Sequence, residues 1–313
     1  VMEPQRVQPR SVNIETFAWG YNGEDKLQGM SEMLQKMGIT VNAYLPAADL
    51  QTIKKAPRAA LNIVRRKKWA LAMEQRFGTP FLHVADMQEW HGIEGISDLY
   101  RQIGKMLGCE NAVERVLQEE YERVAARYQE LGADFAKYKF CLIAHGIAYL
   151  PDALRVYQQD YGLPITKICI IMNPSYQAET GLDDAMMQRF KDRIELAKAE
   201  YGCDAEILLE PSEDALREAA QSCDFVICNG HPRYAALDVP VLYNLFDRSV
   251  WSYQGFVDIM EEVWQMLQQP QRTGSNLLLS KLAYDPVFYP MREADKDSKA
   301  SRELYSRVWR QRK

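Results

Sequence analysis

Strand-like and helix-like stretches alternate along almost the whole chain, and this alternation limits the folds that the chain can adopt. Strand-like apolar runs occur first at residues 11–18, 41–45, 59–64 and 81–84. They occur again at residues 139–144, 167–172, 205–209, 225–228 and 239–243. Alternating strands and helices are typical of parallel sheets that are covered by helices on both faces. The sequence therefore predicts an α/β protein with two Rossmann-like, doubly wound parallel-sheet domains.

Two long amphipathic stretches separate the two groups of strands. At residues 93–107 and 112–131 the apolar positions recur at a spacing of three and four, which predicts two helices that each bury one stripe. We therefore expect a first βα domain at residues 1–92 and bridging helices at 93–136. A second βα domain at 137–270 and a charged, aromatic tail with a terminal helix at 271–313 complete the predicted organisation.

Length and charge exclude several classes of protein. A chain of 313 residues is long enough for two domains that bury their own cores. With 38 basic and 43 acidic residues the net charge is −5, which disfavours wrapping of nucleic acid. We see no apolar run long enough to span a membrane and no signal-peptide pattern in the first ten residues, so we expect a cytoplasmic protein with no membrane partner.

The six cysteines are spread along the chain and none belongs to a C-x-x-C pair. Cys141, Cys169 and Cys228 lie within apolar runs that are predicted to be buried strands. Buried free cysteine behaves as a small apolar residue, and a reducing compartment agrees with this use. We therefore expect structural thiols and no metal centre held by this chain.

Ligands of open α/β sheets bind beyond the carboxyl ends of the strands, so residues that directly follow a strand are candidate site residues. Arg65 and Arg66 open a basic run after the strand at 59–64, where helix N–H groups and cationic side chains attract anions. A solvated helix start is the alternative interpretation, because exposed charge runs contribute little energy.

The second domain offers histidine and cysteine at the same kind of position. His145 and Gly146 follow the strand at 139–144, while Cys228 ends the strand at 225–228 and precedes Asn229 and His231. Cysteine and histidine bind soft metals, but this spacing supplies two potential ligands where a metal site needs three or four. We therefore expect a cleft without a metal, and packing or surface roles for His83 and His91.

Several common motifs are absent from the sequence. It contains no G-x-G-x-x-G after a strand, no G-x-x-x-x-G-K-[ST] and no G-x-S-x-G. Dinucleotide binding of the usual kind, P-loop ATP hydrolysis and nucleophile-elbow hydrolysis are therefore not supported. The residues alone predict a two-domain α/β protein with a ligand-binding cleft.

The order of several segments goes further and resembles a known family. SVNIETFAWGYNGEDKLQGMSEMLQKMGITVNAY, followed by APRAALNIVRR, MEQRFGTPFLHV and GIEGISDLYRQIGKMLG, is similar to the second domain of nitrogenase component 1-type subunits. DVPVLYNLFDRSVWSYQGFVDIMEEVWQML resembles the closing unit of the same family, and its NLFDR segment is closer to the β-type or scaffold-type branch. The resemblance covers most of residues 11–267.

The resemblance implies an oxidoreductase subunit. Its relatives receive electrons from an ATP-driven iron–sulfur reductase and pass them through a cluster to a cofactor or substrate in an interdomain cleft. It also implies a paired component 1-type subunit, an oligomer, and cluster cysteines in a first domain that this chain lacks. We therefore expect an iron–sulfur cluster in the full-length family member only, and an inactive chain when it stands alone.

The sequence departs from the catalytic α-type pattern of this family. The cofactor-ligating cysteine aligns at or near Asn62, which cannot replace a thiolate, and no histidine occurs at 243–246, where the ligating histidine is expected. We assign no catalytic residue and no metal ligand. The candidate cofactor-binding residues are Asn62, Arg65, Arg66, His145, Gly146, Cys228, Asn229 and His231.

Two alternatives to the oxidoreductase fragment remain open from the sequence. The first is a non-catalytic scaffold or binding subunit that holds a small anion or cofactor. A periplasmic-type ligand binder, which also closes two βα domains on its ligand, is the second alternative. Its expected signal peptide and oxidised cysteines have no counterpart in the sequence.

Overall fold

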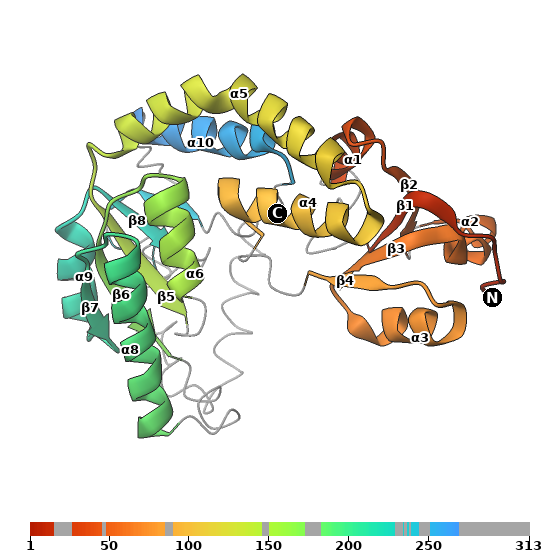
Figure 1. The fold of residues 1–313 in the computed structure, drawn as a ribbon. Helices are drawn as coiled ribbons and strands as arrows, with labels where there is room; N and C mark the ends of the chain where they lie inside the picture. Colours follow the sequence, from red (N-terminus) through yellow and green to blue (C-terminus); the bar gives the residue numbers. More distant parts are fainter. Residues whose placement is uncertain are drawn as a thin grey trace, which may run out of the picture. The chain divides into compact units, whose positions relative to one another are not determined.

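The chain folds into two compact units, which we describe separately (Figure 1). The structure is a computed structural model and describes residues 1–15, 27–45, 48–84, 90–145, 150–172, 183–228, 234, 237, 239–243 and 251–268. Unit 1 contains the described residues of Val1–Phe135, Arg155–Gly162 and Leu245–Trp264. Unit 2 contains those of Ala136–Leu154, Leu163–Asn244 and Gln265–Lys313. In the described part of the chain we find no helix with the length and apolarity that crossing a membrane requires.

Unit 1 is built on a sheet of four parallel strands in the order β2-β1-β3-β4. The strands are β1 (Gln8–Glu15), β2 (Thr40–Leu45), β3 (Ala59–Val64) and β4 (Phe81–His83). Numbered within the unit, this is the order 2-1-3-4. The chain adds β2 on one side of β1 and then β3 on the other side, so the strand order reverses between β1 and β3. Such a reversal is the topological switch point at which α/β sheets bind their ligands.

Short helices follow the strands of this sheet. They are α1 (Gln28–Lys36), α2 (Leu50–Lys54), the 3-10 turn η2 (Ala56–Arg58) and α3 (Lys67–Phe77). α3 ends because Gly78 adopts a left-handed conformation with φ of 73°, which glycine tolerates without steric cost. The start of α2 is capped by the Asp49 side chain, which accepts the N–H groups of Gln51 and Thr52.

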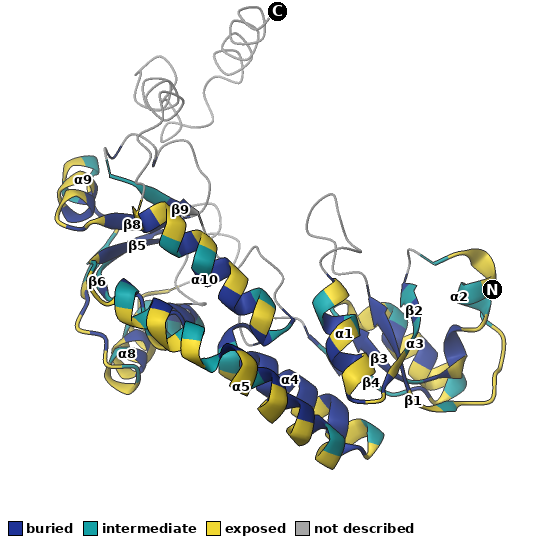
Figure 2. Cartoon of the chain, turned by 90° about the horizontal axis from the view of Figure 1, so that it is seen from above, coloured by how far each residue is buried: buried dark blue, intermediate teal, exposed yellow. Residues whose placement is uncertain are grey.

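Long helices complete unit 1. α4 (Gly92–Leu107) is followed by α5 (Glu110–Phe135), and the first part of α10 (Tyr253–Gln268) lies alongside α5 (Figure 1). Tyr121 contacts Tyr253 and Arg127 pairs with Glu261, so α5 and α10 run in the same direction. Figure 2 shows exposed and buried stripes alternating along α5, as its apolar spacing predicted.

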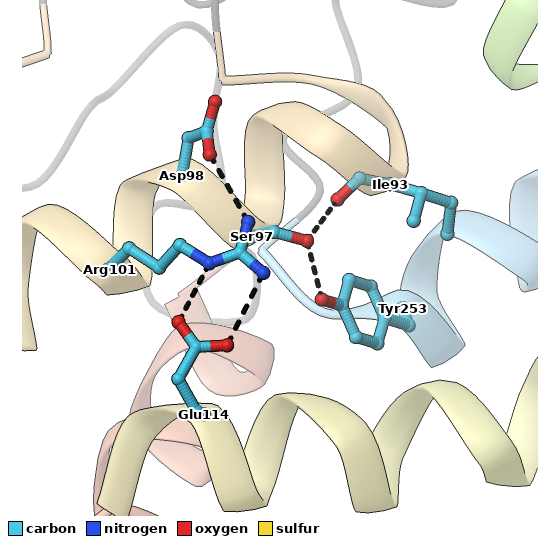
Figure 3. Close-up of polar contacts among 6 residues, drawn as sticks. All are labelled: Ile93, Ser97, Asp98, Arg101, Glu114 and Tyr253. Atoms are coloured by element: carbon cyan, nitrogen blue, oxygen red, sulfur yellow. Dashed lines mark hydrogen bonds and ion pairs between the residues drawn. The ribbon is translucent and has the colours of Figure 1, made fainter. Parts of the chain in front are cut away.

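A buried hydroxyl pair joins α4 to α10 (Figure 3). The Ser97 Oγ donates to the Ile93 carbonyl at 2.6 Å and lies 2.6 Å from the Tyr253 hydroxyl, which therefore donates to it. On the same helix Arg101 Nε lies 2.8 Å from Glu114 of α5. The hydroxyl pair is buried and the ion pair is exposed, so the hydroxyl pair contributes the more specific contact.

The first turn of α4 rests on a buried polar cluster. Asp160 Oδ2 lies 3.0 Å from Arg155 Nη1, and Arg155 Nη2 donates to the His91 carbonyl at 3.2 Å. His91 Nε2 lies 3.0 Å from the Tyr161 hydroxyl. Asp160 also accepts hydrogen bonds from the N–H groups of Ile93 and Glu94, so its carboxylate caps the positive end of α4. His91, expected to be a packing or surface residue, is therefore a buried packing residue.

Unit 2 is built on a sheet of five parallel strands in the order β7-β6-β5-β8-β9. The strands are β5 (Phe140–His145), β6 (Ile165–Ile171), β7 (Glu206–Leu209), β8 (Phe225–Cys228) and β9 (Val241–Tyr243). Numbered within the unit, this is the Rossmann order 3-2-1-4-5, with its switch point between β5 and β8. The predicted pair of parallel-sheet Rossmann-like domains is confirmed.

The helices of unit 2 are α6 (Leu150–Leu154), α8 (Asp184–Glu200) and α9 (Glu213–Gln221). Ser212 caps α9, because its Oγ accepts the N–H of Ala215 at 3.2 Å. α6 is followed directly by a π-helical turn, η3 (Arg155–Asp160), which belongs to unit 1. This turn places Arg155 and Asp160 together at the start of α4.

Both units are assembled from segments that are distant in sequence. In unit 1, η3 and the first part of α10 belong with the helices α4 and α5. No local sequence pattern predicts such contacts. The sequence-based boundaries at residues 92, 136 and 270 therefore remain a proposal. The predicted terminal helix within 271–313 lies outside the described residues.

Candidate functional site

The switch point of unit 1 is lined by the end of β1 and the residues that follow β3. Glu15, the last residue of β1, is 5% exposed, and its Oε2 accepts the N–H of Arg65 at 2.7 Å and of Arg66 at 2.8 Å. Parallel strands bring these residues together because their carboxyl ends lie at one edge of the sheet. The sequence therefore placed Arg65 and Arg66 at the correct edge.

The Glu15 carboxylate sits where the sequence suggested a bound anion. Two backbone N–H groups ahead of α3 already donate to it, so an external anion would have to bind through side chains or displace it. The Arg66 side chain is 78% exposed, and its Nε lies 3.7 Å from Glu15 Oε1. When Arg66 turns towards a ligand, the buried Glu15 carboxylate keeps its hydrogen bonds from the N–H groups of Arg65 and Arg66.

His83 supports the same loop from the end of β4. Its Nε2 lies 3.0 Å from the Arg65 carbonyl, and because a carbonyl oxygen only accepts, the protonated Nε2 of His83 donates this hydrogen bond. This contact holds the Arg65–Arg66 turn between β1 and β4. His83 was expected to have a packing or surface role, and the geometry gives it this loop-supporting role.

Asn62, aligned with a cofactor-ligating position of the family, lies inside the sheet. It is fully buried on β3, and its Oδ1 accepts a hydrogen bond of 2.8 Å from Asn13 Nδ2. Asn13 also donates to the Ala56 carbonyl and accepts from Asn42 Nδ2, each at 2.8 Å. Among the described residues Asn62 Nδ2 has no acceptor. The three amides form a ladder across β2, β1 and β3 that stabilises the sheet next to the switch point.

The switch point of unit 2 carries two of the predicted residues at strand ends. His145 is the last residue of β5, and Cys228 is the last residue of β8. Cys228 is 2% exposed, and burial raises the pKa of its thiol to about 12, which disfavours the thiolate at neutral pH. Gly146, Asn229 and His231 lie outside the described residues.

Sequence reasoning missed a strained glutamate at the same edge of unit 2. Glu210 directly follows β7 with φ of 48°, a left-handed conformation that a residue with a Cβ rarely adopts. Its Oε1 accepts the N–H of Met172, which follows β6, and its own N–H donates to the Ile170 carbonyl at 2.9 Å. Glu15 and Glu210 share one signal in the sequence, namely a single glutamate that ends or directly follows an apolar run.

The described side chains do not fit an iron centre. No three histidine, cysteine, aspartate or glutamate residues of the described ranges gather in an arrangement that could hold a metal ion. The family-aligned Asn62 is engaged in the amide ladder, and burial raises the pKa of the Cys228 thiol. The described residues therefore offer no set of ligands for iron.

Comparisons with known proteins agree with this architecture. A family described as "Nitrogenase component 1 type Oxidoreductase" matches residues 1–268. The B-type subunit of light-independent protochlorophyllide reductase from Zygnema circumcarinatum is 31% identical over 99 residues, which are 30% of this chain and 18% of that protein. The corresponding protein from Angiopteris evecta is 25% identical over 134 residues, 41% of this chain and 26% of that protein.

A solved structure titled "Nitrogenase Cp1 at pH 6.5" has the same fold, with a TM-score of 0.55 and 16% sequence identity. The similarity covers 85% of this chain and 60% of that chain. The chain thus matches only part of the length of these relatives. Because the family match covers most of the chain, the protein belongs to the nitrogenase component 1-type oxidoreductases.

Proposed function

We propose that this chain is part of an oxidoreductase subunit in which electrons from an ATP-driven iron–sulfur reductase reach a bound cofactor or substrate. The observation that supports this proposal is the family match over residues 1–268, together with two parallel sheets that each have a switch point, of which that of unit 1 carries the charged side chains of Glu15 and Arg66. In the proposal, the cluster is held by residues other than those described, and a paired component 1-type subunit completes the oligomer. The similarity to B-type reductase polypeptides favours the β-type branch.

The chain's own residues would bind and orient the ligand. At the switch point of unit 1 the exposed Arg66 guanidinium offers a bidentate donor for a carboxylate or phosphate group, while Glu15 keeps the loop beneath it in place. His145, the last residue of β5, is the corresponding candidate in unit 2. These side chains position a ligand and do not themselves carry electrons.

Reconstitution would test the proposal. The natural full-length product should be purified without oxygen, its iron measured, and its reduction by an ATP-dependent iron–sulfur reductase followed spectroscopically. We expect bound iron and ATP-dependent electron transfer. Absence of iron together with absence of ATP-dependent reduction would contradict the proposed function.

The Arg66→Ala variant would locate the ligand. Loss of its guanidinium should raise KM for an anionic substrate several-fold, about 1–2 kcal/mol of lost binding, because a charge-assisted hydrogen bond contributes about that much. Arg115→Ala is the matched control, since this arginine lies on α5, is 67% exposed and pairs only with Glu119 of its own helix in the contacts described. Equal effects of both variants would argue against a ligand at the unit 1 switch point.

A non-catalytic scaffold or binding subunit is the second candidate. The observation in its favour is the amide ladder, because Asn62 occupies the family-aligned position with a neutral, hydrogen-bonded side chain. Such a subunit should bind inorganic phosphate or citrate and show no ATP-dependent turnover. Joint replacement of Arg65 and Arg66 by Ala should weaken its affinity for the anion. Anion affinity that is unchanged in this double variant would count against it. The periplasmic-type alternative gains no support from the family match, which assigns the chain to an oxidoreductase family.

A further inference from the structure

Carboxylates of the chain itself occupy three helix starts of unit 1. Asp49 accepts two N–H groups in the first turn of α2, and Glu15 accepts two N–H groups directly ahead of α3. Asp160 lies against the start of α4, where a Cβ on Gly92 would come within 2.0 Å of its Oδ2. Free N–H groups at helix starts are the donors with which α/β proteins bind phosphate. At these three starts a carboxylate of the protein takes the place of such an anion.

Glu15 lies at the switch point itself, because it is the last residue of the central strand β1. It is buried, and its Oε2 accepts the N–H of Arg65 at 2.7 Å and of Arg66 at 2.8 Å. A phosphate that used these donors would have to displace the buried carboxylate or place a second negative charge beside it. Both cost free energy, since a buried charge is stable only with its partners. The backbone donors of this turn are therefore committed to Glu15.

The Arg66 side chain stays accessible beside this turn. Its guanidinium is mostly exposed, and its Nε lies 3.7 Å from Glu15 Oε1, a longer contact than the two backbone hydrogen bonds. A guanidinium is a planar fork of N–H donors that matches the two oxygens of a carboxylate. A phosphate group has three acceptor oxygens and a charge of up to about −2, so one guanidinium satisfies it only in part. The turn therefore suits a carboxylate better than a phosphate.

We propose that Glu15 is a specificity-determining residue, which makes the unit 1 switch point accept a ligand carboxylate at Arg66 and reject a phosphate group. The inference rests on the ligand-binding role of Arg66 in the proposed function, and it narrows the ligand of that site to one class of anion. Glu15 acts without touching the ligand. It withholds the backbone N–H groups, and its charge repels a phosphate dianion about twice as strongly as a carboxylate at the same distance.

Benzoate and phenyl phosphate test the proposal, because they share a phenyl ring and differ in their charged group. Each is titrated at about pH 7.5, where the phosphate is a dianion, into the isotope-labelled 313-residue chain. NMR follows the Nε–H signal of the Arg66 side chain and the backbone N–H signals of Arg65 and Arg66. We expect benzoate to shift the side-chain signal to saturation. Phenyl phosphate should bind about tenfold more weakly, which corresponds to one charge-assisted hydrogen bond.

Removal of the Glu15 carboxylate should reverse this preference. In Glu15→Ala the two N–H groups become free, so phenyl phosphate should bind at least about tenfold more tightly than to the wild-type chain and shift both backbone signals. Glu15→Gln is the second variant if the alanine variant fails to fold. It loses the charge but keeps one acceptor oxygen, so it should weaken the preference without reversing it. Glu32→Ala is the matched control on α1, which removes an exposed carboxylate and should keep the wild-type preference.

Three results would overturn the proposal. They are equal or tighter binding of phenyl phosphate by the wild-type chain, an unchanged preference in a folded Glu15 variant, and no shift of the Arg66 side-chain signal by benzoate. The titration uses no iron, no ATP and no reductase. A failed reconstitution of electron transfer would therefore contradict the proposed function alone, whereas any of these three results would contradict the carboxylate specificity alone.

Discussion

The carboxylate of Asp160 fills the space beside the Cα of Gly92, where a Cβ would lie 2.0 Å from Asp160 Oδ2. Gly92 has φ of 79° and begins α4, while Asp160 ends the π-helical turn η3. The close approach allows the carboxylate to reach the N–H groups of Ile93 and Glu94. Glycine is therefore required here for both its backbone conformation and its missing side chain.

Gly92→Ala should destabilise unit 1 by about 3–5 kcal/mol, because the added Cβ pushes Asp160 away from Arg155 and from the helix start and so breaks a buried ion pair. Gly108→Ala is the control at the other end of α4. Its φ is 63° and nothing lies within 4 Å of its Cβ position, so only the left-handed backbone cost of about 1–2 kcal/mol applies. Urea unfolding of both variants measures the difference, and equal losses would show that the Asp160 contact contributes little.

The buried cluster at the start of α4 contains two groups with opposite pH dependence. Burial outweighs Arg155 and raises the pKa of Asp160 from 3.8 to about 7, so its stabilising contribution is present below 3.8 and is lost as the pH rises towards 7. Burial, assisted by Arg155, lowers the pKa of His91 from 6.5 to about 3. The His91 contribution is therefore present above 6.5 and is lost as the pH falls towards 3.

Variants of these two residues should reveal the opposing slopes. In Asp160→Asn the free energy of unfolding should rise with pH between 3.8 and 6.5, because His91 then acts alone. In His91→Gln it should fall with pH over the same interval. Each slope approaches at most about 1.4 kcal/mol per pH unit. Urea midpoints measured across this interval check the prediction, and parallel profiles for the two variants would refute it.

Removing one hydroxyl or the other from the pair between α4 and α10 should destabilise the protein by different amounts (Figure 3). Ser97→Ala should cost about 1–3 kcal/mol, because it leaves the Tyr253 hydroxyl buried without its partner. Tyr253→Phe should cost less, since Ser97 keeps its bond to the Ile93 carbonyl. The double variant should lose less than the sum, which a double-mutant cycle measures. Additive losses would show that the two hydroxyls are not coupled.

Asn13 is the centre of the amide ladder in unit 1. Asn13→Ala should destabilise the protein by about 2–3 kcal/mol, because it leaves the buried Ala56 carbonyl and the Asn62 amide without their hydrogen bonds. Asn42→Ala is the control, since Asn42 is half-buried and makes one bond to the ladder, and it should cost less than about 1 kcal/mol. Thermal unfolding compares the two variants, and a smaller loss of stability in Asn13→Ala than in Asn42→Ala would contradict the structure.

Glu15→Ala should turn the start of α3 into an anion site. Removal of the carboxylate frees the N–H groups of Arg65 and Arg66, so inorganic phosphate should raise the unfolding temperature of the variant more than that of the wild-type protein. Glu32→Ala is the control on α1, where the carboxylate accepts a hydrogen bond from the exposed Gln28 amide. The same phosphate response in all three proteins would rule out a site at this turn.

Much of the fold could be predicted because it depends on local patterns. The strands Ala59–Val64 and Phe225–Cys228 were predicted with their observed bounds, since apolar runs between turn residues mark buried parallel strands. Arg65, Arg66, His145 and Cys228 were placed beyond or at strand ends for the same reason. Their roles in ligand binding remain predictions.

The polar contacts around these positions could not be predicted. Glu15 and Asp160 each contact a helix start that is far away in sequence, and Cys141 meets Cys169 only after β5 and β6 pair. Such contacts depend on which strands become neighbours, and hydrophobic spacing carries no information about strand order. The carboxylates at β1 and β7 were missed because a single glutamate after an apolar run also occurs in ordinary loops.

The sequence by itself determined the alternation of strands and helices, the α/β class and the family, because periodicity and segment order are properties of the chain. Only the tertiary structure decided the strand orders β2-β1-β3-β4 and β7-β6-β5-β8-β9, and with them the two switch points. It also placed Asn62 in a buried ladder and brought the thiols of Cys141 and Cys169 together. The physical reason is that strand pairing and burial join residues that are far apart in sequence, and their combined energy exceeds any local preference.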